Sequence, residues 1–315
     1  GDIQMGFYAM GSHDIVQGTN CPIQDEGNNI IAQACYQIAK EFDIEPYDEH
    51  TGKGILRHVI GRIGQSGWMI ILVTATEQLP HKEKWVEKLT ERIPQVETIV
   101  HNVNGKRTNV ILGPKNNILY GDGTITDHIK DLRFTLSPHS FFQVNPEQTT
   151  VLFDQALTYA DLKGDETVID AYCGTGTISL FLAHKAKHVI GIEIVEPAII
   201  NARENAQRNG YDNTEFIVAD AAVEMPKLYN AGVRPDVIVF DPIRAGCKEE
   251  VLTSAAGMKP KRIVYVSCNP ATMARDIEIL THYGYELQEV QPVDMFPMTA
   301  HVEAVALLTR SKATQ

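Results

Sequence analysis

Five short apolar runs rich in Val and Ile, separated by stretches with helical spacing, constrain the fold of the second half of this chain. They lie at residues 166–170, 188–194, 214–220, 236–241 and 262–267. Apolar runs that alternate with helices are typical of βαβ units, whose parallel sheet is covered on both faces. Two further runs, 285–296 and 301–310, predict a closing pair of antiparallel strands. The sequence therefore predicts an α/β domain here.

The first half has a different pattern. Apolar spacing predicts helices at 30–42 and 82–93, and the strands predicted between and after them lie at 58–64, 68–76, 96–104, 109–113 and 133–138. This is a mixed α+β unit with short connections. We expect two domains, an α+β central, RNA-binding domain at 1–135 and a catalytic domain at 136–315.

Composition narrows the class of protein. The chain has 315 residues, 43% of them hydrophobic, which is enough for two cores. No apolar run is long enough to span a membrane, and no signal peptide is present at the start. Five cysteines form no C-x-x-C pair, which argues against disulfides and a structural zinc site. We expect a cytoplasmic protein with no membrane partner and no metal.

The net charge of −12 is unevenly distributed along the chain. Residues 51–135 hold twelve Lys and Arg against eight Asp and Glu, a balance of +4, so the remainder carries −16. Such asymmetry indicates either a surface that faces a polyanion or an ordinary solvated surface. The candidate RNA contacts are Arg57, Arg62, Lys106 and Arg107.

A glycine loop follows the first strand of the α/β half. Gly174 and Gly176 allow a ligand to approach the backbone beside a helix amino end. Ser179 stands where a dinucleotide fingerprint requires its third glycine, so this is not that motif. Glu193, at the end of the next strand, could accept hydrogen bonds from ribose hydroxyls. Acids at several strand ends fit the rule that α/β sheets bind ligands at their carboxyl edge, although each alone could be a helix cap.

Cys268 lies between a predicted strand and a predicted helix. Asn269 suits the cap of that helix and Pro270 its first position. A cysteine at a strand end is either a packing residue or a nucleophile. The adjacent helix amino end is expected to lower the pKa of the thiol.

The glycine loop and the strand-end acids together resemble the class I S-adenosylmethionine methyltransferases, which have a Rossmann-like, mostly parallel seven-stranded sheet. Further motifs resemble the RNA uridine-C5 methyltransferase family over nearly the whole chain. They are GSHDIV (11–16), SPHSFFQVNPEQ (137–148), DPIRAGC (241–247), SCNP (267–270) and DMFPMTAHVE (294–303). The resemblance to members that act on 23S rRNA is closer than to those that act on tRNA.

This resemblance implies a mechanism. The Cys268 thiolate would add to uracil C6, the resulting enolate would take a methyl group from S-adenosylmethionine, and Glu303 would remove the C5 proton. Asp241 and Arg244 would hold the uracil edge and the cofactor amine region.

The resemblance also implies the contacts with cofactor and substrate. Gln143, Tyr172, Gly174 and Glu193 would contact the cofactor, Asp220 its adenine, and Phe142 the substrate. Cys173 and Cys247 are expected to be packing residues, since neither stands in the SCNP position.

The chain departs from the family pattern in three ways. Ile243 stands where the family has the second proline of DPPR. Cys21 and Cys35 cannot by themselves make the four-cysteine iron–sulfur cluster of some members. We also expect the family's N-terminal β-barrel RNA-binding module to be absent from this sequence.

Three other functions remain open. The first is uridine-C5 methylation of tRNA. The second is amino-group methylation, although Arg244 replaces the aromatic residue of a D/N-P-P-Y motif and Cys268 would have no task. The third is a non-catalytic RNA-binding factor, and the presence of both Cys268 and Glu303 argues against it.

Overall fold

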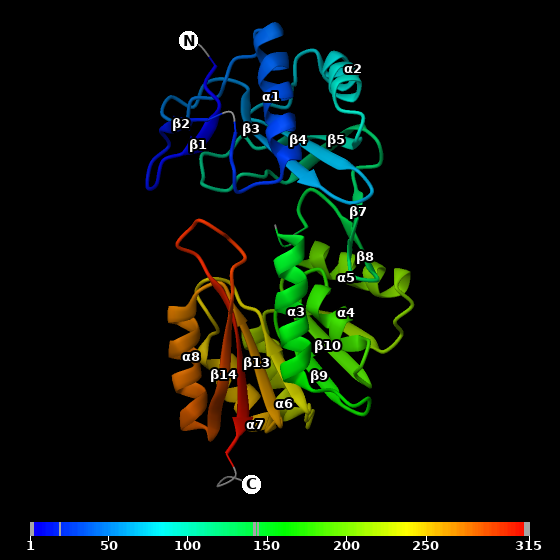
Figure 1. Ribbon diagram of the computed structural model, residues 1–315, viewed down its shortest axis with the longest axis vertical. Helices are drawn as coiled ribbons and strands as arrows, with labels where there is room; N and C mark the ends of the chain where they lie inside the picture. The colour runs from blue at the N-terminus through cyan, green and yellow to red at the C-terminus, as the bar shows by residue number, and fades with distance from the viewer. Residues whose placement is uncertain (1–2, 19, 141–142, 144, 312–315) are drawn as a thin grey trace. The chain divides into compact units, whose positions relative to one another are not determined.

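The computed structural model describes residues 3–18, 20–140, 143 and 145–311. The chain divides into two compact units. The first comprises Gly1–His128 and Thr135–Ser140, and the second comprises Ile129–Phe134 and Phe141–Gln315. Figure 1 labels most of their helices and strands.

The first unit is built on a four-stranded sheet with strand order β3-β4-β5-β6. Its strands are β3 (Leu56–Ile63), β4 (Trp68–Thr74), β5 (Val96–Val103) and β6 (Lys115–Tyr120). Helices α1 (Glu26–Glu41) and α2 (Lys82–Arg92) pack their apolar sides against this sheet, where Ile38, Trp85 and Leu89 are fully buried. Asp25 caps α1 by accepting a hydrogen bond from Gly27 N. A separate hairpin of β1 (Gly6–Tyr8) and β2 (Ile15–Gln17) precedes α1.

The strand predicted at 109–113 is wrong. The strand of this region is β6, and residues 109–113 form an irregular segment held by side chains. Asn104 donates to the carbonyls of Val110 and Ile111, and Asn102 exchanges two hydrogen bonds with Gly113. Asparagine side chains therefore take the place of a strand partner.

The second unit contains a seven-stranded sheet with strand order β11-β10-β9-β12-β13-β15-β14. Its strands in chain order are β9 (Thr167–Asp170), β10 (His188–Glu193), β11 (Thr214–Val218), β12 (Val237–Phe240), β13 (Arg262–Ser267), β14 (Tyr285–Val293) and β15 (Glu303–Arg310). All neighbours pair in parallel except β15, which is antiparallel to β13 and β14. The predicted Rossmann-like sheet and its antiparallel closing pair are confirmed.

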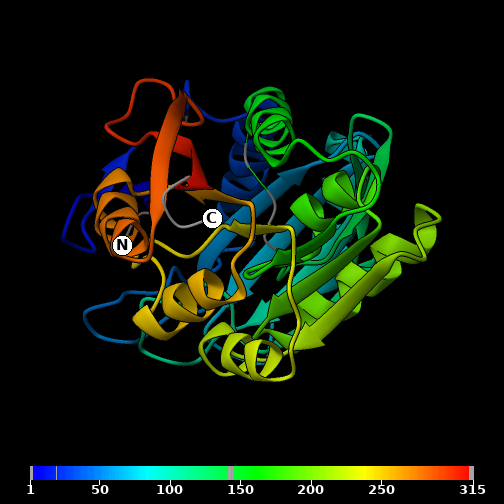
Figure 2. The same cartoon turned by 90° about the horizontal axis from the view of Figure 1, so that it is seen from below.

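Helices lie on both faces of this sheet (Figures 1 and 2). They are α3 (Pro146–Ala160), α4 (Thr177–Ala183), α5 (Glu196–Arg208), α6 (Ala221–Asn230), α7 (Glu249–Met258) and α8 (Pro270–His282). One continuous core unites α6, α7 and α8 with the strands, and Met225, Leu252 and Ile277 are among its buried side chains. A short hairpin of β7 (Ile125–Ile129) and β8 (Leu132–Leu136) comes before α3 in the chain.

Candidate active site

Strand register brings a cysteine and a glutamate together at the carboxyl edge of the parallel strands. Ser267, the last residue of β13, pairs with Ala304 of antiparallel β15. Cys268 follows Ser267 and Glu303 precedes Ala304, so the two residues lie opposite each other where these strands meet the edge. On the other side of β13, Phe240 of β12 pairs with Tyr265, which places Asp241 at the same edge.

The local structure around Cys268 follows the sequence prediction. Asn269 caps α8 by accepting a hydrogen bond from Ala271 N at 3.2 Å, and Pro270 occupies the first turn. The Ser267 hydroxyl accepts from Asn269 N at 3.0 Å and so fixes the bend that carries the cysteine. Cys268 is partly buried. The thiol is therefore held in one place at a strand end while keeping some access to solvent.

The predicted lowering of the Cys268 pKa is wrong. Burial raises the pKa of this thiol, and the carboxylates of Glu303 and Asp241 raise it further. Only the Arg244 guanidinium and a backbone hydrogen bond act in the opposite direction. The shift thus comes from burial and from two neighbouring acids that the linear sequence does not place beside the cysteine.

Glu303 is a buried carboxyl group, with 4% of its surface exposed. Burial raises its pKa, and the positive charge of Arg244 works against this shift. A raised carboxyl pKa lies closer to neutral pH, which suits a general base that must accept a proton and release it.

Two further carboxyl groups, those of Asp241 and Asp170, lie at the ends of strands β12 and β9. Asp241 is partly buried, and burial together with the charges of Glu303 and Asp170 raises its pKa well above the usual range. Asp170, the last residue of β9, is fully buried and accepts a hydrogen bond from Ser179 Oγ at 2.6 Å. Burial raises its pKa to about 6. Sequence reasoning missed Asp170, although an acid that ends a strand just before a glycine loop is a signal that could have found it.

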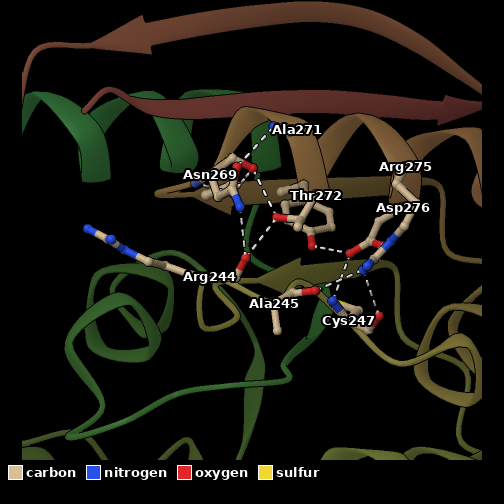
Figure 3. Close-up of polar contacts among 10 residues, drawn as sticks. Arg244, Ala245, Cys247, Asn269, Ala271, Thr272, Arg275 and Asp276 are labelled. Atoms are coloured by element: carbon tan, nitrogen blue, oxygen red, sulfur yellow. Dashed lines mark hydrogen bonds and ion pairs between the residues drawn. The ribbon is translucent and has the colours of Figure 1, made fainter. Parts of the chain in front are cut away.

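The loop that carries Arg244 is tied to helix α8 (Figure 3). The Arg244 carbonyl accepts hydrogen bonds from Asn269 Nδ2 at 3.0 Å and from Thr272 Oγ1 at 3.2 Å. Farther along, Asp276 Oδ2 accepts from Cys247 N at 2.7 Å and from the Tyr265 hydroxyl at 2.5 Å. These bonds hold the backbone although Ile243 replaces a proline. The Arg244 side chain is exposed and extends away from them.

The glycine loop and its neighbours fit S-adenosylmethionine. A Cβ atom added at Gly174 would meet no atom within 4 Å, so the loop leaves open space there. Glu193, at the end of β10, accepts hydrogen bonds from Gly174 N at 3.3 Å and Val195 N at 2.9 Å, which fixes its carboxylate beside that space. Asp170, the residue that ends β9 just before this loop, is fully buried.

The other predicted cofactor contacts differ in their burial and in their bonding. Asp220 caps α6 through Ala222 N and pairs with Lys248 at 2.9 Å. Tyr172 is partly buried against the core, and burial raises its pKa. Gln143 is partly buried, and Phe142 lies outside the described residues. Cys247 and Cys173 are both buried, and burial raises the pKa of Cys247 to about 12, as suits packing residues.

The four predicted RNA contacts do not form one exposed patch. The Arg57 side chain is only 1% exposed and is bonded to Glu49 at 2.7 Å and to two backbone carbonyls. Arg62 is largely buried and donates to the Pro138 carbonyl, and burial lowers its pKa. Lys106 and Arg107 are exposed, but Arg107 donates to the carbonyls of Glu49 and His50. Arg57 and Arg62 are thus structural residues of the first unit rather than free cations.

A cavity of about 770 Å³ lies in the first unit, lined by the β1–β2 hairpin, α1 and β3. No predicted catalytic or cofactor-binding residue lines it. Within the described residues there is no cluster of His, Cys, Asp and Glu suited to a metal ion. Their helices likewise include none long and apolar enough to cross a bilayer.

Comparison with known proteins decides the family. The sequence model of the tRNA (uracil-5-)-methyltransferase family matches residues 70–311. The chain belongs to this family. An uncharacterized RNA methyltransferase of Halalkalibacterium halodurans is 53% identical over 310 residues, covering 98% of this chain and 68% of that protein. A Bacillus cereus protein named in the same way is 52% identical over 312 residues, with the same coverage of both chains.

A solved structure agrees with this assignment. The tRNA (uracil-54, C5)-methyltransferase of Pyrococcus abyssi, in complex with S-adenosyl-L-homocysteine, superposes with a TM-score of 0.80 at 29% identity. The match covers 94% of this chain and 70% of that one. The predictions of a class I fold, of the uracil-C5 methyltransferase family and of a methyltransferase enzyme are confirmed.

The carboxylates beside Cys268 lead to a prediction about its titration. In Glu303→Gln the negative charge that disfavours the thiolate is gone, so the pKa of Cys268 should fall relative to the wild type. The rate of alkylation by iodoacetamide, followed against pH by peptide mass spectrometry, should then reach half its maximum at a lower pH. An unchanged midpoint would show that Glu303 does not lie close enough to influence the thiol. Glu286→Gln, on the exposed face of β14, is the control.

Glu193 leads to a prediction about the cofactor. Glu193→Ala should weaken binding of S-adenosylmethionine by about 10- to 100-fold, because hydrogen bonds to a charged acceptor contribute roughly 1.5–3 kcal/mol. Calorimetry measures the affinity, and circular dichroism should show an unchanged fold. Glu215→Ala, an exposed position on the neighbouring strand β11, should have no effect. Equal affinities for wild type and Glu193→Ala would remove Glu193 from the cofactor site.

Proposed function

We propose that this protein methylates C5 of uridine in 23S rRNA, producing 5-methyluridine through a covalent adduct between Cys268 and C6. The observation that carries the chemistry is the opposition of Cys268 and buried Glu303 across β13 and β15. Uracil C5 is a poor nucleophile, so the reaction needs a group that adds to C6 and a base that acts at C5. The two residues supply this pair at the edge where the cofactor residues Gly174 and Glu193 also lie.

The reaction begins when the Cys268 thiol loses its proton to solvent and the thiolate forms a bond to C6. A C4–C5 double bond then replaces the C5–C6 double bond, and the C4–O4 electron pair moves to O4. S-adenosylmethionine would supply an electrophilic methyl group: C5 bonds to the methyl carbon as the C4–O4 double bond re-forms, the sulfonium S–CH3 bond breaks, and S-adenosylhomocysteine is the leaving group. The Glu303 carboxylate then takes the C5 proton, the double bond re-forms, and the thiolate leaves C6. Asp241, at the same sheet edge, can hold the uracil edge, and Arg244 can stabilise the negative charge on O4.

In this proposal the first unit contributes RNA contacts, with exposed Lys106 and Arg107 as its available cations among the four that the sequence singled out. The motif resemblance supports 23S rRNA as the target. The similarity to the P. abyssi enzyme, named for uracil-54 of tRNA, favours tRNA as the second candidate.

Mass spectrometric mapping of RNA distinguishes the two targets. Ribosomal RNA and tRNA are purified from the organism with the gene intact, deleted, and restored. Loss of 5-methyluridine from 23S rRNA on deletion, and its return on restoration, is expected. Loss from tRNA alone would establish the second candidate. Restoration with a Cys268→Ala gene should leave the uridine unmodified in either case.

A further inference from the structure

A tight turn with an exposed methionine at its tip precedes Glu303. In the loop between β14 and β15, the Phe296 carbonyl accepts hydrogen bonds from Thr299 N at 3.2 Å and from Thr299 Oγ1 at 2.8 Å. His301 N donates to Thr299 Oγ1 at 3.1 Å, which extends this bonding toward the strand. Pro297 and Met298 are the two central residues of the turn. These hydrogen bonds hold the segment from Phe296 to His301, which ends two residues before Glu303, the first residue of β15.

Met298 has a backbone conformation that its residue type disfavours. Its φ is +63°, in the left-handed region where glycine normally occupies the third position of such a turn. In the described part of the chain five other non-glycine residues have positive φ, and all five are polar or charged: Asp43, His81, Lys130, Asp161 and Lys259. Met298 is also 90% exposed. Neither backbone preference nor burial explains a methionine here.

The neighbours of Met298 argue against a protein-docking surface. Thr299, Ala300 and His301 are exposed but small or polar, so the methionine is a single projecting side chain rather than part of an apolar patch. A lone side chain buries too little area to hold a protein partner. It is sufficient, however, for insertion between two stacked bases.

The reaction creates a need for such a side chain. A thiolate reaches C6 only from the face of the uracil ring, and in stacked RNA the neighbouring bases cover both faces. An enzyme that acts on a stacked base extrudes it at the cost of unstacking. Apolar side chains that enter the vacated space reduce this cost, and methionine is among the residues used as wedges.

We propose that Met298 is the wedge that enters the RNA stack when the target uridine turns out toward Cys268. This inference rests on the proposed function. Met298 is exposed at the turn, five residues before Glu303 in the sequence. Ile243, 77% exposed on the loop after β12, gives the same edge a second apolar side chain, on the opposite side of β13.

The test compares two short transcripts centred on the uridine that mapping identifies. In one transcript the uridine is base-paired within a stem, and in the other it is single-stranded. Met298→Ala should lower kcat/KM on the stem by roughly 10- to 100-fold, because the wedge offsets the cost of unstacking. On the single-stranded transcript the change should be small. Met298→Leu, which keeps a large apolar side chain, should retain the activity on the stem that Met298→Ala loses.

Two further variants separate the wedge from a structural role. Met298→Gly removes the side chain but suits the left-handed backbone, so its thermal unfolding temperature should be equal to or above that of the wild type while activity on the stem falls. Leu287→Ala, which shortens another exposed side chain of the same hairpin, should not alter activity on either transcript.

Equal losses on both transcripts, or no loss on either, would overturn the wedge. Failure of the wild-type enzyme to methylate either transcript would overturn the proposed function, and the wedge with it. The two failures can be told apart because the proposed function is tested with the wild-type enzyme alone, whereas the wedge is tested with the Met298 variants.

Discussion

Cys268→Ala should abolish methylation of RNA and formation of any covalent RNA–protein complex. In the proposed mechanism the thiolate converts uracil C5 into a nucleophile, and we expect no other thiol of the described site loops to replace it. Cys173 and Cys247 are buried, and burial raises the pKa of each. Methyl transfer from a radioactive donor measures turnover, and a denaturing gel detects the complex.

The control for this variant is Cys247→Ala, which removes a neighbouring thiol of the same catalytic unit. It should retain methyl transfer, with some loss of stability because the side chain is buried. Cofactor binding by Cys268→Ala should equal that of the wild type, which excludes a folding defect. If Cys268→Ala still methylates RNA, the nucleophile is wrongly assigned and an amino-group methyltransferase becomes the better reading.

Glu303→Gln should behave differently from Cys268→Ala. Addition to C6 and methyl transfer can both proceed, but the glutamine amide cannot take the C5 proton. The thiolate therefore stays bonded to C6, and a methylated RNA–protein complex should accumulate. A positioned base contributes about 10²- to 10⁴-fold, so release should be slow rather than absent.

The kinetics of a single turnover distinguish this trap from simple inactivation. The complex should appear at a rate near that of wild-type methyl transfer and decay on the order of 10²- to 10⁴-fold more slowly than wild-type product release. Glu286→Gln, on the exposed face of β14, should turn over normally. A Glu303→Gln enzyme that is inactive and forms no complex would show that Glu303 is not the eliminating base.

The α/β fold could be predicted because its determinants are local. The segments 237–240 and 263–266 are apolar throughout, as buried parallel strands require, and Asn269-Pro270 marks the start of α8. The strand predicted at 109–113 was wrong because its apolar residues resemble a strand, whereas its backbone is held by the side chains of Asn102 and Asn104, and sequence alone does not show which atoms those side chains bond.

The site was only partly predictable, for a physical reason. The motifs single out Cys268 and Glu303, but their opposition depends on the register between β13 and antiparallel β15, 35 residues apart in the sequence. The pKa of the thiol is raised by its burial and by the charges of Glu303 and Asp241, which are tertiary features. Burial of Arg57 is likewise a tertiary feature, so a count of basic residues could not show that its guanidinium is already paired with Glu49.

Mass spectrometry of the Glu303→Gln complex tests the covalent mechanism most directly. The enzyme is incubated with target RNA and S-adenosylmethionine, then digested with nuclease and protease. We expect one cross-linked peptide, which contains Cys268 and carries a uridine nucleotide with one added methyl group. The same peptide should be absent from Cys268→Ala. A cross-link at another residue, or methylated RNA released without any cross-link, would contradict the account.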